Sequence, residues 1–209
     1  MYPPKNVYIF APTSNQAPDI HNPAGNDATG VFQPGARQFE AFCKKQGANT
    51  KLVFFDNGAP EDRILDYILT NMATAPPPLD TVAYFGHGDK NMLASAMIGP
   101  GYLPKFIASL RATCDFTPTI ILYACSCGAQ GGIASKIADG LSDLLAEVYG
   151  HLSLGHAYMN PQVRAFPGFR TVCPSGKVDA WLKAFADPKS DLWMRFPFMT
   201  EEEIAQELS

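Results

Sequence analysis

The chain has 209 residues, which is enough for one domain with a substantial core but short for two. Hydrophobic residues make up 46% of it and charged residues 17%, so the composition excludes a disordered protein. A net charge of -4, with no run of Lys or Arg, argues against binding to nucleic acid. We therefore expect a single folded domain over residues 1–209, which ends in an aromatic tail at 187–209.

The sequence shows no targeting signal that we can identify. The first residues, MYPPKNVYIFAP, lack the apolar core and cleavage site of a signal peptide. No apolar run approaches the roughly 18 residues of a membrane span. The five cysteines are an odd number in an acidic chain, which argues against a disulfide framework. These features predict a cytoplasmic protein that binds no membrane, and no cofactor is indicated.

Strand and helix patterns alternate along the first half of the chain. A buried strand is expected at 6–12, and a long polar loop then runs from Thr13 to about Gly35. Long loops of this kind often carry function, so it is a candidate wall of a binding site. A helix over 36–46 should end at Gly47, where glycine adopts the left-handed cap. The next expected elements are a strand at 51–58, a helix at 61–72 and a strand at 81–88.

The same alternation continues in the second half. The apolar run at 117–125 is typical of a central parallel strand that is buried on both faces. Around it we expect a helix over Leu103 to Leu110 and a helix from about Gln130 to Leu145. Residues 148–158 are expected to form a strand with its following loop, and a weaker strand is expected at 169–173. Short helices are expected at 177–186 and 200–208. This order predicts a three-layer α/β fold with a mostly parallel six-stranded sheet flanked by helices.

Two of the predicted strands end in reactive side chains. The third ends in Phe85-Gly86-His87-Gly88, and the fourth ends in Tyr123-Ala124-Cys125-Ser126-Cys127-Gly128. Ligands bind at the carboxyl ends of parallel strands, so His87 and Cys125 face one crevice if these strands are neighbours. Histidine supplies the base that a cysteine nucleophile needs near neutral pH.

Glycines accompany both reactive residues. Gly88 is expected to let a substrate carbonyl approach the backbone, and Gly128 to turn the chain into the helix near Gln130. The amino end of that helix would then favour a negative charge near the Cys125 sulfur.

A hydrophobic strand ending in His-Gly, followed by one ending in Ala-Cys-x-x-Gly, resembles the caspase-like (clan CD) cysteine peptidases. That group includes caspases, legumains, gingipains, separases and bacterial CHAT-type proteases, and the chain resembles a distant, bacterial-type member. The resemblance covers about residues 6–160 in strand order and is specific only at YFGHG and ILYACSCG. It implies a caspase-like fold and peptide-bond hydrolysis, with Cys125 as nucleophile and His87 in proton transfer to the leaving amine. It also implies an oxyanion hole made by the backbone N–H groups of Gly88 and Cys125.

The substrate contacts are less defined. In this clan the strand after the cysteine's helix walls the S1 pocket, which implies roles for His151, His156 and Tyr158. Asp56 and Asp89 follow strand ends and weakly favour a basic side chain before the scissile bond. The chain lacks the caspase sequence Gln-Ala-Cys-Arg-Gly and a basic pair for an aspartate. The expected partner is a peptide or protein substrate, and a homodimer or a dedicated partner protein stays open.

Two other functions remain open on the sequence alone. A zinc site has enough ligands in His87, Cys125, Cys127, His151 and His156, although Cys-x-Cys is tighter than the usual Cys-x2-Cys spacing. A non-catalytic caspase-like interaction module is the other alternative, with the reactive residues covered by the long first loop or the aromatic tail. The remaining cysteines, and Cys127 beside the motif, are predicted to be structural.

Overall fold

The computed structural model describes residues 4–13, 32–151, 163–166 and 170–171. Most of the predicted first loop, the two predicted C-terminal helices and the aromatic tail at 187–209 lie outside these residues. Among the described helices, none combines the length and apolar character that crossing a membrane requires.

Helices and strands alternate in the described part of the chain much as the sequence predicts. The strands are β1 (Asn6–Pro12), β2 (Asn49–Phe55), β3 (Leu79–Phe85), β4 (Cys114–Tyr123), β5 (Glu147–His151), β6 (Val163–Phe166) and β7 (Arg170–Thr171). The helices are α1 (Phe32–Lys45), α2 (Glu61–Ala73), α3 (Leu103–Thr113) and α4 (Ile133–Gly140), with short 3-10 turns η2 (Ala94–Ala96) and η3 (Ser142–Leu144).

The strands form one sheet in the order β2-β1-β3-β4-β5-β6-β7. The first five are parallel, whereas β6 and β7 join the edge of β5 antiparallel. The predicted α/β fold with a mostly parallel sheet flanked by helices is confirmed. The described sheet has seven strands rather than six. The strand expected within 148–158 is β5, which ends at His151. Strand β7 lies within the strand predicted at 169–173, and β6 was not predicted.

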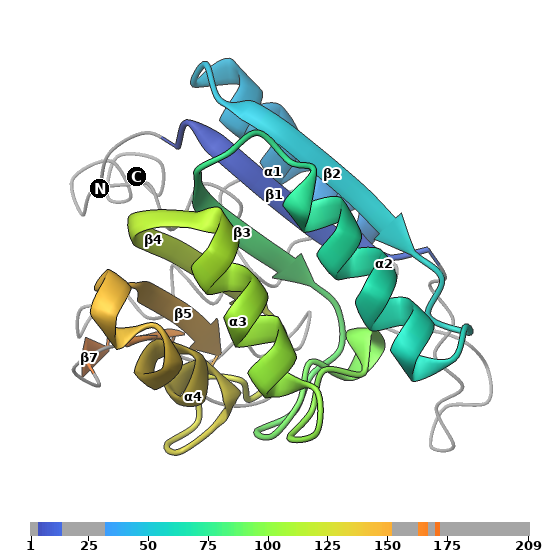
Figure 1. Cartoon of the computed structure of the whole chain (residues 1–209), viewed down its shortest axis with the longest axis vertical. Coiled ribbons are helices and arrows are strands. Elements are labelled where there is room, and N and C mark those ends of the chain that lie inside the picture. The colour runs from blue at the N-terminus through green and yellow to red at the C-terminus, as the bar shows by residue number, and fades with distance from the viewer. Residues whose placement is uncertain (1–3, 14–31, 152–162, 167–169, 172–209) are drawn as a thin grey trace, which may run out of the picture.

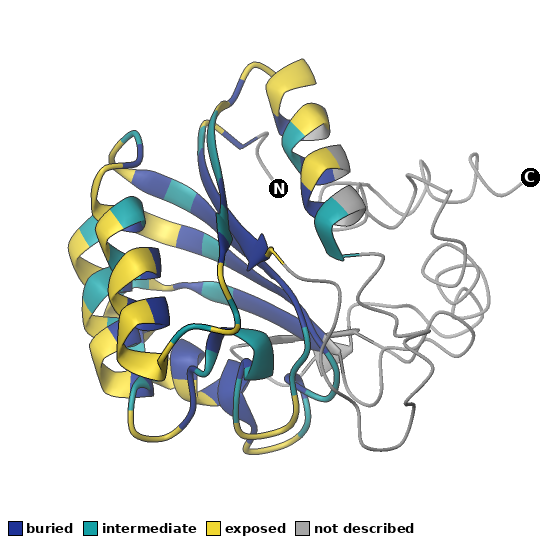
Figure 2. Cartoon of the chain, turned by 90° about the vertical axis from the view of Figure 1, so that its right-hand side faces the viewer, coloured by how far each residue is buried: buried dark blue, intermediate teal, exposed yellow. Residues whose placement is uncertain are grey.

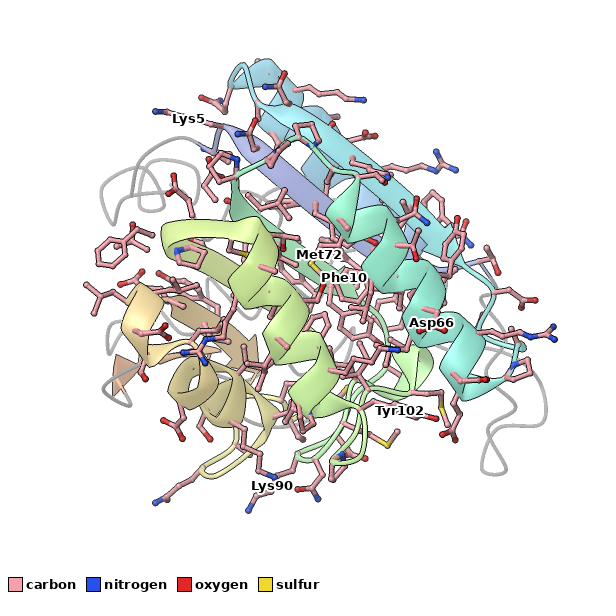
Figure 3. The ribbon with its side chains drawn as sticks, in the orientation of Figure 1. Lys5, Phe10, Asp66, Met72, Lys90 and Tyr102 are labelled. Atoms are coloured by element: carbon pink, nitrogen blue, oxygen red, sulfur yellow. The ribbon has the colours of Figure 1, made fainter. Side chains whose placement is uncertain are left out.

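The sheet is the middle of three layers. Figure 1 shows α2, α3 and α4 in front of it, and Figure 2 shows α1 against the opposite face. The strands alternate between these layers: on β1, Tyr8 and Phe10 face one core cluster while Val7 and Ile9 face the other. Phe10 and Met72 lie between the sheet and α2 in the larger cluster (Figure 3). Because both faces are covered, the central strands have continuous apolar sequences.

Helix α1 is fixed against the carboxyl end of β1. It ends as predicted before Gly47, whose φ is 86°. It begins at Phe32, four residues earlier than the sequence predicts, so the pattern-based boundary at 36 is wrong. The side-chain amide of Gln33 donates to the carbonyl of Pro12 at 3.2 Å and also to that of Thr13. These bonds bring the first turn of α1 to the end of the sheet that carries the motif residues.

Candidate active site

The two strands that carry the motif residues are neighbours in the sheet. β3 and β4 run parallel, and their register pairs Phe85 with Tyr123. His87 and Cys125 therefore each stand two residues beyond the same paired position, at the carboxyl end of the sheet. A hydrogen bond of 3.3 Å from the N–H of Gly86 to the Tyr123 carbonyl extends the ladder toward them. The strand adjacency on which the sequence prediction depends is present.

Hydrogen bonds hold both backbone groups of His87. Its N–H donates to Ser95 Oγ at 2.9 Å, and its carbonyl accepts from the Tyr84 hydroxyl at 2.7 Å. The Ser95 N–H donates to the same carbonyl at 3.3 Å. The imidazole meets the ring of Phe32 edge-on, with centroids 5.2 Å apart and planes at 84°. His87 thus has a fixed backbone, and the first residue of α1 lies against its side chain.

Cys125 lies in a tight loop between β4 and α4, here called the Cys loop (residues 124–132). Cys125 is partly exposed. Ser126 has a φ of 55°, in the left-handed region that non-glycine residues rarely adopt. Its carbonyl accepts a hydrogen bond of 3.0 Å from the Ala129 N–H, which closes the turn. Such backbone strain persists only where surrounding structure imposes it, and it is frequent at functional sites.

The Cys loop is joined to the loop after β3, here called the His loop (residues 86–93). The buried Cys127 thiol donates to the Asp89 carbonyl, with sulfur and oxygen 3.6 Å apart. The Ile133 N–H, at the start of α4, donates to the Lys90 carbonyl at 2.7 Å. Figure 3 shows Lys90 at the lower end of the view, among the loops that follow β3 and β4. The two loops are therefore held together by contacts that do not involve His87 or Cys125.

Gly88 of the His loop packs directly against the Cys loop, where there is no room for a side chain. A Cβ added there would lie 2.8 Å from both Ala124 Cβ and Cys127 Sγ, and 3.2 Å from the Met92 carbonyl oxygen. Within the described residues no acceptor takes the N–H of Gly88. From the sequence, Gly88 was expected only to let a substrate carbonyl approach the backbone. The structure adds that glycine is needed for the loops to touch.

The chain enters α4 later than predicted. The helix begins at Ile133 rather than near Gln130, and Gly131, with a φ of 67°, makes the turn that was assigned to Gly128. The backbone of Gly128 packs against β5, since a Cβ added to Gly150 would lie 2.9 Å from the Gly128 nitrogen. The prediction failed because one glycine in a Gly-rich stretch cannot be told from the next by sequence pattern.

The amino end of α4 does not direct its first N–H groups at Cys125. The Ile133 N–H is bonded to the Lys90 carbonyl, and the Ala134 N–H donates to the Cys127 carbonyl at 3.0 Å. Two of the helix's terminal donors are thus satisfied within the loops. The expected support of the Cys125 sulfur by this helix is therefore weaker than the sequence suggested.

Burial raises the thiol pKa of three described cysteines, Cys43, Cys114 and Cys127. It raises the pKa of the Cys43 and Cys114 thiols to about 12. It also raises the pKa of Cys127 well above the ordinary value, and charge on neighbouring Cys125 and Asp89 raises it further. The thiolate is the form that alkylates, so each of these three thiols is expected to be inert near neutral pH.

We predict that iodoacetamide at pH 8 labels Cys43, Cys114 and Cys127 at least about tenfold more slowly in the folded protein than in guanidinium chloride. The reason is the raised pKa of each thiol together with its burial. A time course followed by peptide mass spectrometry measures the three rates in one sample. Fast labelling of Cys127 in the folded protein would contradict the burial of its thiol against the His loop.

The two candidate aspartates shape their own turns. Asp56 Oδ1 accepts from the Gly58 N–H at 2.9 Å, and β2, which it follows, is separated from β3 by β1. Asp89 Oδ1 accepts from the N–H groups of Asn91 at 2.5 Å and Met92 at 3.1 Å. Asp89 therefore lies in the His loop itself, whereas Asp56 is not brought next to His87 or Cys125.

The remaining predicted site residues lie mostly outside the described part of the chain. His151 is the last residue of β5, the strand that neighbours β4, so its backbone stands at the same end of the sheet. His156 and Tyr158 lie outside the described residues, as do Cys173 and the aromatic residues of the tail. Among the residues that the structure describes, no three of His, Cys, Asp or Glu are grouped so as to hold a metal ion.

Sequence reasoning missed three residues that contact His87. Tyr84 and Ser95 bind its backbone, and Phe32 meets its ring. A weak signal existed for Tyr84, because a tyrosine in a buried strand needs a partner for its hydroxyl. Nothing local to Ser95 or Phe32 indicates a contact that depends on the tertiary fold.

Comparisons with known proteins do not add to this geometry. The chain was compared with protein-family models, curated proteins and solved structures, and none of them matches it.

Proposed function

We propose that the chain is a cysteine endopeptidase with a caspase-like fold, which hydrolyses peptide bonds through His87 and Cys125. The observation that carries the proposal is the placement of these residues at equivalent positions beyond two paired strands. The interlocked His and Cys loops support it, because they hold both residues on rigid supports. Catalytic groups must be held in a productive geometry, and rigid elements do so better than free loops.

The proposed reaction has two steps. The Cys125 thiolate attacks the substrate carbonyl carbon, and the negative oxygen that forms is stabilised by the N–H groups of Gly88 and Cys125. The C–N bond then breaks, the leaving amine takes a proton from His87, and a thioester remains on Cys125. In the second step His87 accepts a proton from water, the water oxygen attacks the thioester, and the C–S bond breaks. Among the described residues no acceptor takes the N–H of Gly88, which fits its proposed role in the oxyanion hole.

The proposed substrate is a peptide or protein. A basic residue before the scissile bond stays a prediction, and among the described carboxylates only Asp89 is close enough to the motif to bear on it. Its two backbone hydrogen bonds hold the carboxylate in the His loop. Location in the cytoplasm, action on a dedicated partner protein and formation of a homodimer are further expectations from the sequence.

The decisive experiment is alkylation of Cys125 by iodoacetamide at pH 6, compared between the wild type and His87→Ala. A thiol paired with a histidine is expected to react as the thiolate, so the wild type should label quickly. In His87→Ala we expect the rate constant to fall by about tenfold or more. Cys43, whose pKa is raised to about 12 by burial, is an internal reference in the same digest.

Two results would reject the proposal. If Cys125 labels no faster than Cys43, the thiol is not activated, and a non-catalytic interaction module becomes the better explanation. If fast labelling persists in His87→Ala, another group activates the sulfur and the dyad is wrong. Zinc in the purified protein at one equivalent per chain would instead support a metal site at the cysteine and histidine cluster.

A further inference from the structure

Hydrogen bonds join the backbone of His87 to two side chains, one from before it and one from after it in the sequence. The Tyr84 hydroxyl donates to the His87 carbonyl at 2.7 Å, and the His87 N–H donates to Ser95 Oγ at 2.9 Å. We call these residues, Tyr84, His87 and Ser95, the His87 clamp. The clamp fixes the peptide groups on both sides of the His87 Cα.

Tyr84 is the buried member of the clamp. It lies in β3 and is fully buried in the larger core cluster, where its ring is tilted against that of Phe10 with centroids 5.1 Å apart. Its hydroxyl lies against Gly86, two residues further along the chain. A Cβ added to Gly86 would lie 2.3 Å from the Tyr84 oxygen. Burial raises the pKa of Tyr84 well above its ordinary value, so the hydroxyl stays protonated and remains a donor at neutral pH.

Ser95 is held from the other side of the His loop. It lies in η2, between Leu93 and Ile98, which pair with each other in an isolated β-bridge. The buried side chains of Leu93 and Ile98 anchor this turn in the larger core cluster. Ser95 therefore approaches His87 from a packed support, and its N–H adds a second bond to the His87 carbonyl at 3.3 Å.

We propose that Tyr84 and Ser95 are positioning residues, which aim the His87 imidazole at Cys125 by clamping the His87 backbone. This inference rests on the proposed function, because it assigns a purpose to the orientation of His87. The two clamping side chains have separate supports: Tyr84 is fixed in the core of the sheet, and Ser95 in the turn that follows the His loop. Small displacements of a catalytic group lower rates strongly, so loosening either bond should slow the chemistry that depends on His87.

The test measures the rate constant of Cys125 alkylation by iodoacetamide from pH 5 to 9 in a set of variants. Tyr84→Phe removes the donated bond and retains the ring, and Ser95→Ala removes the acceptor for the His87 N–H. Tyr8→Phe is the matched control, because Tyr8 is a buried β1 tyrosine whose hydroxyl donates to the Ile68 carbonyl at 2.8 Å, away from the site. Ser95→Thr retains the hydroxyl and serves as the rescue variant.

We expect Tyr84→Phe and Ser95→Ala to lower the rate constant at pH 6 by about three- to tenfold, as expected for one hydrogen bond. Tyr8→Phe should leave it within about twofold, although both tyrosine variants should melt at similarly lowered temperatures. Ser95→Thr should restore most of the rate. In a His87→Ala background, Tyr84→Phe should have no further effect, since the clamp acts through the imidazole.

The outcomes separate the inference from the proposed function. If His87→Ala slows alkylation but Tyr84→Phe matches Tyr8→Phe, the clamp has no positioning role and the dyad stands. If Tyr84→Phe slows alkylation equally in the His87→Ala background, the effect is general loop distortion and the inference is overturned. If His87→Ala itself does not slow alkylation, the proposed function and the inference are both rejected. Should Tyr84→Phe fail to fold, the Ser95→Ala and Ser95→Thr pair decides alone.

Discussion

Replacement of Cys125 by alanine is expected to abolish peptide hydrolysis, with a fall of about 10³-fold or more in the rate. The variant removes the proposed nucleophile and leaves His87, Gly88 and the rest of both loops in place. Cys125 is only partly exposed rather than part of the buried core, so the free energy of unfolding should change by less than about 1 kcal/mol. Release of aminomethylcoumarin from a mixed-sequence peptide library measures the activity, and thermal melting followed by circular dichroism measures the stability.

Cys114→Ala is the matched control for this prediction. Cys114 is the first residue of β4, and Cys125 follows the other end of the same strand. Removal of the Cys114 thiol should therefore leave hydrolysis within about twofold of the wild type. Hydrolysis that survives in Cys125→Ala, or that is lost equally in Cys114→Ala, would contradict the assignment of the nucleophile.

The elements with strong apolar periodicity could be predicted closely from the sequence. The helix predicted at 61–72 is observed as α2 over Glu61–Ala73, because its apolar residues repeat at helical spacing and bury one face. The strand predicted at 6–12 is β1 over Asn6–Pro12, whose side chains are buried from Val7 onward. These boundaries could be predicted because the spacing of the apolar residues identifies the buried face of each element.

Elements that depend on tertiary contacts were predicted less well. The start of α1 at Phe32 lies in a stretch of polar and small residues with no helical period, and bonds from Gln33 to the end of β1 help to fix it. Strand β6, which has no counterpart in the prediction, pairs with the edge of β5, and β7, which lies within the strand predicted at 169–173, pairs with β6. Their pairing is a property of the sheet edge, which the sequence of four or two residues cannot show.

The position of the candidate site could be predicted, but not the means by which it is held. His87 and Cys125 were found because reactive residues follow two apolar strands, and parallel strands bring their carboxyl ends together. The partners of the His87 backbone come from two places: Tyr84 from the strand before it and Ser95 from the turn after it. The sequence gives only a weak signal for the Tyr84 contact and none for the Ser95 contact, because both depend on how the His loop folds back on the core.

The glycines near the site also have a role that the sequence did not predict. The sequence associated Gly88 and Gly128 with substrate approach and with a turn. In the structure, Gly88 lies between Ala124 and Cys127, and Gly150 lies against the backbone of Gly128. Close packing against the Cys loop explains the glycines at 88 and 150, and such packing is seen only when the Cys loop is placed beside the His loop and β5.

Gly88→Ala is accordingly expected to damage both stability and activity. Its Cβ would come within 2.8 Å of Ala124 Cβ and Cys127 Sγ, which is closer than carbon and sulfur atoms approach in folded proteins. Overpacking of this kind typically lowers the free energy of unfolding by about 1–3 kcal/mol. Relief of the clash must also move the His loop away from the Cys loop, and we expect the rate of hydrolysis to fall by about ten- to a hundredfold.

The cause of this loss can be tested by a matched control and a rescue. Gly101→Ala introduces the same methyl group where nothing lies within 4 Å, so stability and activity should stay near the wild type. Cys127→Ala in the Gly88→Ala background removes one of the two atoms that clash, and it should recover part of the lost activity although it deletes a buried thiol. Urea unfolding and the hydrolysis rate are measured on all four proteins. Failure of Cys127→Ala to restore any activity would show that Gly88 acts through its own backbone at the oxyanion rather than through the spacing of the loops.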